Sequence, residues 1–113
     1  MLANPEIYLK QAIQLAIENV QKNGGPFGAV ILKDDEIIAA ATNSVTRDSD
    51  PTAHAEINAI RLAAKKLSTH DLSGCILFSS CEPCPMCMSA IYWAKIDQVY
   101  FAATKVDAEN AGF

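Results

Sequence analysis

The segment Cys84-Pro85-Met86-Cys87 constrains the fold of this chain more than any other, because a proline lies between two potential metal ligands. Proline cannot occupy a helix interior, so a helix here must begin at Pro85. Cys84 then lies at the helix cap and Cys87 in the first turn, on a shared face. Unpaired N–H groups and the positive end of the helix dipole should lower the pKa of both thiols. We therefore expect a metal site at a helix N-terminus.

A second set of potential ligands comes earlier in the chain. His54 is one of only two histidines, and Asp50-Pro51 predicts that a helix begins just before it. Residues two apart in a regular helix point in nearly opposite directions, so His54 and Glu56 can face one metal only if His54 lies at the irregular edge of the first turn. Because imidazole and thiolate are the usual zinc donors, we expect one zinc ion per chain between two helix starts, with Glu56 placed to move protons. The other histidine, His70, lies in a polar loop and is interpreted as a solvated residue.

Cys81 leaves two other interpretations of the cysteine cluster open. Cys81, Cys84 and Cys87 are evenly spaced, as in part of an iron–sulfur pattern. Such a cluster needs a fourth cysteine, and Cys75 lies in an apolar run typical of a buried strand. A closed structural zinc site made of His54 and the three clustered cysteines is the stronger alternative. That site would leave no position for water and would therefore be non-catalytic.

Composition bounds the class of protein and its partners. With 113 residues, of which 50% are hydrophobic and 19% charged, the chain is expected to form a single domain over residues 1–113. Its net charge of −4 argues against a nucleic-acid partner, which usually requires a basic surface. No run resembles a signal peptide or reaches the length of a membrane span, so we expect a cytoplasmic protein with no membrane partner. Cytosolic cysteines stay reduced, which favours metal binding over disulfides.

Hydrophobic periodicity predicts the elements in the first half of the chain. Apolar residues recur at helical spacing over residues 5–23, and Gly24-Gly25 should end that helix. Its apolar positions are Leu9, Ala12, Ile13, Ala16 and Val20. The apolar runs 29–32 and 37–41 flank a polar turn and predict a β-hairpin. A polar loop over residues 43–50 should lead into the second helix, whose buried face carries Ile57, Ile60, Ala64 and Leu67.

The second half of the chain alternates between strands and helices. We expect a buried strand over residues 75–78, a helix over 85–95 and a strand over 98–103. The resulting order is α-β-β-α-β-α-β, in which a hairpin comes first and a helical crossover later. A helical crossover joins parallel strands, whereas a hairpin joins antiparallel ones. The expected fold is therefore α/β, a three-layer α/β/α sandwich with a mixed sheet.

His54-Ala55-Glu56 followed by Pro83-Cys84-x-x-Cys87 resembles the signature of the zinc-dependent cytidine deaminase superfamily. The resemblance covers nearly the whole chain, from the glycine-rich segment 24–28 to Phe113. It implies the same cytidine deaminase-like sandwich that the element order predicts.

Finer features point to one branch of that superfamily. The segment Ser80–Cys87, leading into Ala90-Ile91-Tyr92-Trp93-Ala94, resembles bacterial guanine deaminases, as does the segment 107–113 that ends in Ala-Gly-Phe. The transfer-RNA adenosine deaminases share Pro51–Glu56 and the cysteine pair. They tend to be basic, however, and the Tyr92-Trp93 pair is not expected in them.

The resemblance implies a role for individual residues. Zinc would be held by the three residues already identified, His54, Cys84 and Cys87. Glu56 would carry protons from the attacking water to the purine ring and to the leaving amine. Four further residues would contact the substrate: Phe27 packing on the ring, Asn43 hydrogen-bonding its edge, the backbone N–H of Ala55, and Trp93. A tryptophan on a helix can equally belong to the core.

The implied activity is hydrolytic deamination of guanine to xanthine and ammonia, in purine catabolism or salvage. Two alternatives within the superfamily are deamination of guanosine or another nucleoside and deamination of an adenosine in transfer RNA. The non-enzymatic alternative is a structural zinc module that uses Cys81.

Members of the guanine deaminase group continue for several dozen residues past an Ala-Gly-Phe segment. The resemblance implies that those residues supply an acidic group near the pocket, another strand and a C-terminal helix. It also implies a homodimer, domain-swapped in the full-length form, in which this part covers the partner's site. Because this chain stops at Phe113, we expect either a fragment or a shortened form, in which zinc binding survives better than turnover.

Overall fold

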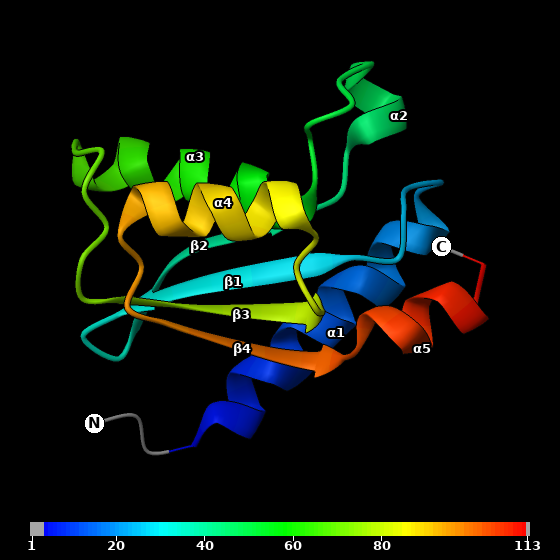
Figure 1. Ribbon diagram of the computed structural model, residues 1–113, viewed down its shortest axis with the longest axis horizontal. Coiled ribbons are helices and arrows are strands. Elements are labelled where there is room, and N and C mark those ends of the chain that lie inside the picture. Colours follow the sequence, from blue (N-terminus) through cyan, green and yellow to red (C-terminus); the bar gives the residue numbers. More distant parts are fainter. Residues whose placement is uncertain (1–3, 113) are drawn as a thin grey trace.

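A computed structural model describes residues 4–112, so Phe113, the last residue of the Ala-Gly-Phe segment, lies outside the described part. Within those residues, four strands form one sheet in the order β2-β1-β3-β4 (Figure 1). The strands are β1 (Gly28–Lys33), β2 (Glu36–Thr42), β3 (Cys75–Cys81) and β4 (Gln98–Ala103). β1 pairs antiparallel with both β2 and β3, whereas β3 and β4 are parallel. The sheet is therefore mixed, as the sequence predicts.

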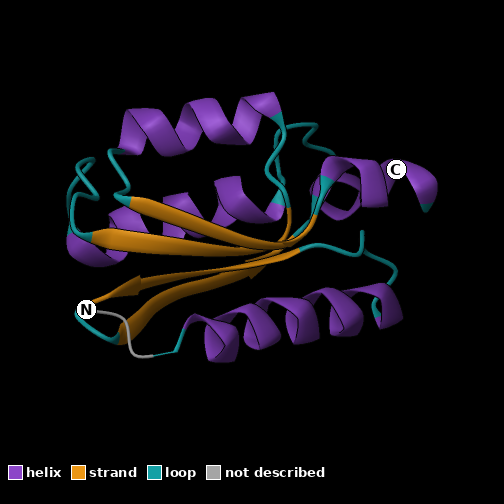
Figure 2. Cartoon of the chain, turned by 60° about the horizontal axis from the view of Figure 1, so that its bottom comes forward, coloured by secondary structure: helices purple, strands orange, loops and turns teal. Residues whose placement is uncertain are grey.

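Helices cover both faces of the sheet and complete three layers. Figure 2 shows one long helix, α1 (Pro5–Gln21), on one face and two helices, α3 (Ala55–Leu67) and α4 (Pro85–Ala94), on the other. Two short helices, α2 (Val45–Asp48) and α5 (Lys105–Asn110), lie toward one end of the sheet in Figure 1. The expected α/β/α sandwich is confirmed. Across residues 4–112, no helix combines the length and apolar character that crossing a bilayer requires.

The alternation of side chains along β1 contributes to a separate buried cluster on each face of the sheet. Ala29 and Ile31 point to the face covered by α3 and α4, whereas Val30 and Leu32 point to the face covered by α1. Both faces of this central strand are buried, which explains why β1 is apolar up to its last residue, Lys33. Gly28 begins β1 where α1 approaches closely, and a Cβ there would lie 2.4 Å from the carbonyl oxygen of Ala12.

The buried face of α1 differs from the predicted one. Ala12 and Ala16 are buried, but Ile13 is 38% exposed and Val20 is 51% exposed. The polar Asn19 is buried instead, because its side chain makes two hydrogen bonds described below. Periodicity identified the helix correctly, but it did not distinguish a core stripe from an apolar surface.

The second predicted helix begins later than the sequence suggests. Asp50 Oδ1 accepts hydrogen bonds from the backbone N–H and the hydroxyl of Thr52, at 2.8 and 2.7 Å, and this turn contains Pro51. α3 therefore starts at Ala55, and the prediction of a helix start at Pro51 is wrong. The predicted polar loop 43–50 contains the one-turn helix α2. α5 was also not predicted.

Candidate active site

The starts of α3 and α4 lie at the same end of the sheet and bring the predicted metal ligands together. His54 is the N-cap of α3 and Cys84 is the N-cap of α4, each with extended backbone angles (φ −70°, ψ 157° and φ −69°, ψ 170°). Pro85 occupies the first turn of α4, as the sequence predicts, and Cys84 Sγ accepts a hydrogen bond of 3.5 Å from the backbone N–H of Cys87. Because His54 lies outside the regular helix, Glu56 in the first turn can share its side of the site.

The loop that leads into α3 is fastened to that helix. Asn58 in α3 donates hydrogen bonds of 2.9 Å to the carbonyl oxygen of Thr42 and to the hydroxyl of Ser44. Thr42 ends β2, so these bonds tie the end of the sheet to the helix that follows His54. The position of the histidine is thereby set relative to the sheet edge.

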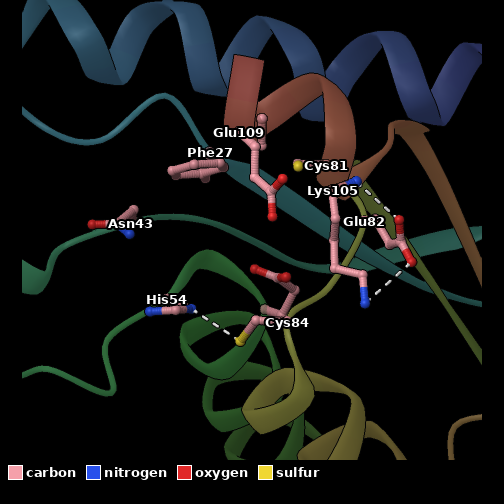
Figure 3. Close-up of a pocket in the computed structure, with 10 residues that line it drawn as sticks. Phe27, Asn43, His54, Cys81, Glu82, Cys84, Lys105 and Glu109 are labelled. Atoms are coloured by element: carbon pink, nitrogen blue, oxygen red, sulfur yellow. Dashed lines mark hydrogen bonds and ion pairs between the residues drawn. The ribbon is translucent and has the colours of Figure 1, made fainter. Parts of the chain in front are cut away.

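The three donor atoms fit a tetrahedral zinc ion. His54 Nδ1 lies 3.6 Å from both Cys84 Sγ and Cys87 Sγ, and the three donor atoms all lie within 4.8 Å of one another. Figure 3 shows His54 and Cys84 turned toward each other. Zn–N and Zn–S bonds of about 2.0 and 2.3 Å at a tetrahedral angle place nitrogen and sulfur about 3.5 Å apart, close to the observed separations. Nδ1 is therefore the nitrogen that faces the metal position. Three protein donors leave a fourth tetrahedral position for water.

Cys81 does not join this group. Its Sγ lies 3.8 Å from the carbonyl oxygen of Thr104, on the far side of the pocket from the donor cluster, and within residues 4–112 only His54, Cys84 and Cys87 converge closely enough to share a metal. Cys75 is fully buried in the core at the start of β3, whereas the donor Cys84 follows the other end of that strand. The geometry therefore disfavours both the closed four-ligand zinc site and an iron–sulfur cluster.

Glu56 lies against the donor cluster in a nearly water-free position. Burial raises the pKa of Glu56 above its ordinary value, and its own backbone N–H, the His54 ring and the Cys87 thiol oppose that rise. A carboxyl group with a raised pKa is suited to accept and return a proton near neutral pH. Its position beside the donor cluster is the one that would let it exchange protons with a water held by a metal at that cluster.

The thiol of Cys87 departs from the sequence-based expectation. Its pKa is raised, first by burial and then by the negative charges of Glu56 and Cys84, even though it lies in the first turn of α4. The helix terminus was expected to lower it. Desolvation of the anion therefore raises the pKa here despite the position in the first helix turn, and the positive charge of a metal would stabilise the thiolate.

A cavity of about 400 Å³ opens in front of Glu56 and the donor cluster. Its lining includes the predicted substrate residues Phe27 and Asn43, which Figure 3 shows on the side of the cavity away from Glu82. Asn43 Oδ1 accepts a hydrogen bond from the Val45 N–H, which leaves the NH2 group to donate to a ligand. Ala55, the first residue of α3, is fully buried, and its N–H is at a position that has no partner within a helix.

Trp93 does not line this cavity. It lies on α4 with 78% of its surface exposed and makes a T-shaped contact with Tyr92, at a centroid distance of 6.2 Å. In the described chain Trp93 therefore lies neither on the lining of this cavity nor in the core. Its helix turns the Tyr92-Trp93 pair outward, because Cys87 and Ile91 occupy the inward face of α4.

A buried side chain holds the two substrate-facing loops together. Asn19 of α1 is 2% exposed, and its Nδ2 donates hydrogen bonds of 2.8 Å to the carbonyl oxygens of Gly25 and Asn43. Asn43 N–H in turn donates to the carbonyl oxygen of Phe27, at 3.2 Å. The sequence gives one signal for this link, a polar residue within an otherwise apolar helix face.

Three polar residues of the cavity were not predicted: Glu82, Lys105 and Glu109. Lys105 and Glu109 belong to α5, and Figure 3 shows them across the cavity from His54 and Cys84. A capping box marks the start of α5, since Thr104 and Asp107 exchange side-chain and backbone hydrogen bonds. The spacing Thr104-x-x-Asp107 is the sequence signal that could have found this helix.

Comparisons with known proteins agree with this geometry. Residues 3–103 match the family model of the cytidine and deoxycytidylate deaminase zinc-binding region. The guanine deaminase of Bacillus subtilis (strain 168) is 57% identical over 97% of this chain, and a crystal structure of that enzyme superposes with a TM-score of 0.96. The tRNA-specific adenosine deaminase of Aquifex aeolicus (strain VF5) is 43% identical over 95% of the chain.

A solved structure in complex with 2,6-diaminopurine provides a further comparison. It is 41% identical, covers the whole of this chain and has a TM-score of 0.93. The chain spans 71% of the Bacillus enzyme, 70% of the Aquifex enzyme and 64% of the diaminopurine-bound protein.

Proposed function

Because this chain belongs to the cytidine and deoxycytidylate deaminase zinc-binding family, we propose that it is a zinc-dependent hydrolase that converts guanine to xanthine and ammonia. The observation that carries the proposal is the open three-donor cluster beside the buried Glu56, at the base of a cavity lined by Phe27 and Asn43. Identity of 57% to a guanine deaminase supports guanine as the substrate, and the diaminopurine complex of a relative supports a purine.

We assign the metal to His54, Cys84 and Cys87, one zinc ion per chain. When bound, zinc acts as a Lewis acid that lowers the pKa of water toward about 7 and so makes hydroxide available near neutral pH. The two thiols and the imidazole Nδ1 form the donor set, and their spacing matches a tetrahedral ion.

In this proposal Glu56 moves the protons. Its carboxylate accepts a proton from the attacking water and passes it to the ring nitrogen beside the amino-bearing carbon. The same carboxylate then takes the remaining proton from the newly added hydroxyl group and delivers it to the amine, so that the carbonyl forms as the C–N bond breaks and ammonia leaves. Burial favours both transfers, because the carboxyl group has few water molecules to exchange protons with.

Phe27, Asn43 and Ala55 orient the purine. The Phe27 ring stacks on the base, and the Asn43 NH2 group donates to an acceptor on its edge. The Ala55 N–H, at the start of α3, is a second donor near the ring. Asn19 holds the first two at a fixed separation through its bonds to both loops.

We further propose a cytoplasmic homodimer that acts in purine metabolism. The four cysteines are free thiols, which suits the reducing cytosol. An apolar groove of about 570 Å³ adjoins the active-site cavity, and its lining includes Ile13, Ile17 and Val20 of α1. Covering this groove by a second copy would remove exposed apolar surface and would also enclose the neighbouring pocket. Sedimentation velocity over a range of concentrations tests this, because a single monomeric species at all concentrations would contradict it.

Ammonia release from a substrate panel tests the activity. Zinc-loaded protein should release ammonia from guanine and leave guanosine, adenine, cytosine and transfer RNA largely unchanged. A related tRNA-specific adenosine deaminase makes transfer RNA the necessary comparison. Glu56→Ala should retain zinc and lose ammonia release. Faster turnover of transfer RNA or guanosine than of guanine would show that guanine is not the substrate. Zinc-loaded protein that is inactive on the whole panel would contradict the assignment of this chain as an enzyme.

A further inference from the structure

The helix α5 is a short wall of the pocket with little support of its own. It has six residues, Lys105–Asn110, and none of them is buried. Helices of this length are marginal in water unless other parts of the protein hold them. The Thr104–Asp107 capping box stabilises its first turn but does not attach it to the rest of the molecule. The contacts that attach α5 to the rest of the protein therefore decide whether this side of the cavity is formed.

Glu82 makes that attachment through its backbone and its side chain. Its N–H donates to the carbonyl oxygen of Ala103 at 2.6 Å, and its Oε1 accepts the Lys105 backbone N–H at 2.9 Å. Its Oε2 lies 3.9 Å from Lys105 Nζ. Figure 3 shows both side-chain interactions between Glu82 and Lys105. The Lys105 N–H is one of the donors that a helix cannot satisfy within itself, so a carboxylate there stabilises the helix start.

The other side of Glu82 is joined to the metal loop. Pro83 follows it, is buried and has a fixed backbone φ angle, and Cys84 comes next. Glu82 therefore contacts the helix that forms the opposite wall and is separated from the metal donor Cys84 by Pro83 alone.

We propose that Glu82 is a positioning residue that holds α5 in place and so completes the purine pocket, an inference that rests on the proposed function. Through α5 it keeps Lys105, Ala108 and Glu109 on the cavity lining. Glu82 lines the cavity but lies outside the donor group of His54, Cys84 and Cys87. Loss of the attachment therefore weakens binding of the purine but leaves the donor cluster and Glu56 unchanged.

Two substitutions at position 82 separate the parts of this link. Glu82→Ala removes the side-chain acceptor and the charge, whereas Glu82→Gln keeps an acceptor for the Lys105 N–H and loses only the ion pair. Glu36, an exposed glutamate at the start of β2, provides the control variant Glu36→Ala. All are compared as zinc-loaded protein.

Amide hydrogen exchange over residues 105–110 is the first measurement. Glu82→Ala should exchange at least about tenfold faster there, Glu82→Gln about threefold faster, and Glu36→Ala at the wild-type rate. Each variant is compared with wild type separately, so Glu82→Gln alone tests whether Glu82 holds α5 if the alanine variant does not fold. Unchanged exchange in both would overturn the proposal.

Zinc content and steady-state kinetics on guanine are the second measurement. Glu82→Ala should raise KM about tenfold and change kcat less than about threefold, because a binding wall is lost without a change in the chemistry. Glu82→Gln should recover most of the loss, and zinc content should stay at the wild-type level. A lower zinc content together with a lower kcat would mean that Glu82 positions the loop that bears Cys84 and not α5. If wild-type protein does not act on guanine, the proposed function fails, but hydrogen exchange still decides whether Glu82 holds α5.

Discussion

The side-chain amide of Asn19 donates a 2.8 Å hydrogen bond to the carbonyl oxygen of Asn43, which is 24 residues away in the sequence. A second bond of the same length goes to Gly25, two residues before Phe27. One buried group of α1 therefore fixes both loops that bear the proposed purine contacts. The fold and the pocket share this group, so a change there should affect stability and substrate binding together.

Asn19→Asp tests that link with almost no change in shape. The carboxylate oxygen that replaces Nδ2 faces two carbonyl oxygens in a buried position, so a hydrogen-bond donor becomes an acceptor without a partner. We expect a loss of about 2–4 kcal/mol in the free energy of unfolding, measured with urea, and a higher KM for guanine. Asn23→Asp, at an exposed turn, is the control and should change stability by less than about 0.5 kcal/mol. Equal stability of the two variants would contradict the role of Asn19.

The contrast between Cys81 and Cys84 predicts which cysteine the metal needs. Cys81→Ser should leave the zinc content at one ion per chain, because its Sγ faces Thr104 and lies outside the donor cluster. Cys84→Ser removes a donor and should lower zinc affinity at least about tenfold. Metal analysis after dialysis against a competing chelator checks both. Loss of zinc from Cys81→Ser would instead support the closed structural zinc site in which Cys81 is the fourth ligand.

The sequence predicted those parts of the fold and site in which local chemistry decides the outcome. The proline after Cys84 fixed the start of α4, and strict apolar runs identified the hairpin. The start of α3 was placed too early, because the side chain of Asp50 closes a turn that delays the helix. α5 was not predicted because its segment has no buried residue and therefore no hydrophobic period.

Other features depend on tertiary packing that periodicity does not contain. The exposed apolar side of α1 looks like a core stripe in the sequence, although Val20 is half exposed. Burial of Cys87 reverses the pKa shift expected from its helix position. The cavity contacts of Glu109 arise only because β4 delivers α5 beside the end of β3.

The position of Trp93 leads to a prediction about substrate contact. Trp93→Ala should change kcat/KM for guanine less than about twofold, because the side chain is 78% exposed and outside the cavity. Phe27→Ala should raise KM roughly 5- to 100-fold, the range expected for losing one aromatic stack on a base. Steady-state kinetics on guanine compare the two variants. If Trp93→Ala weakened activity on guanine as much as Phe27→Ala does, Trp93 would have to contact the substrate.

The raised pKa of Glu56 predicts how the stability of the zinc-free protein varies with pH. Burial raises this pKa above its ordinary value of 4.5, so the folded protein keeps the proton over a pH range in which the unfolded chain has lost it. The folded state then binds more protons, and stability falls as pH rises. The contribution of Glu56 is therefore fully present below pH 4.5 and is lost as pH increases through the raised pKa.

Glu56→Gln removes this titration and keeps the shape of the side chain. The free energies of unfolding of wild type and variant, measured with urea in the presence of a chelator, should differ by a constant amount below pH 4.5. Above that pH, the variant should become progressively more stable relative to wild type. Titrating groups that do not interact with Glu56 are common to both proteins and cancel in the difference. If the difference in the free energy of unfolding stayed constant from acidic to neutral pH, Glu56 would ionise as readily in the folded protein as in the unfolded chain. Its proposed role as a buried proton carrier would then lose its physical basis.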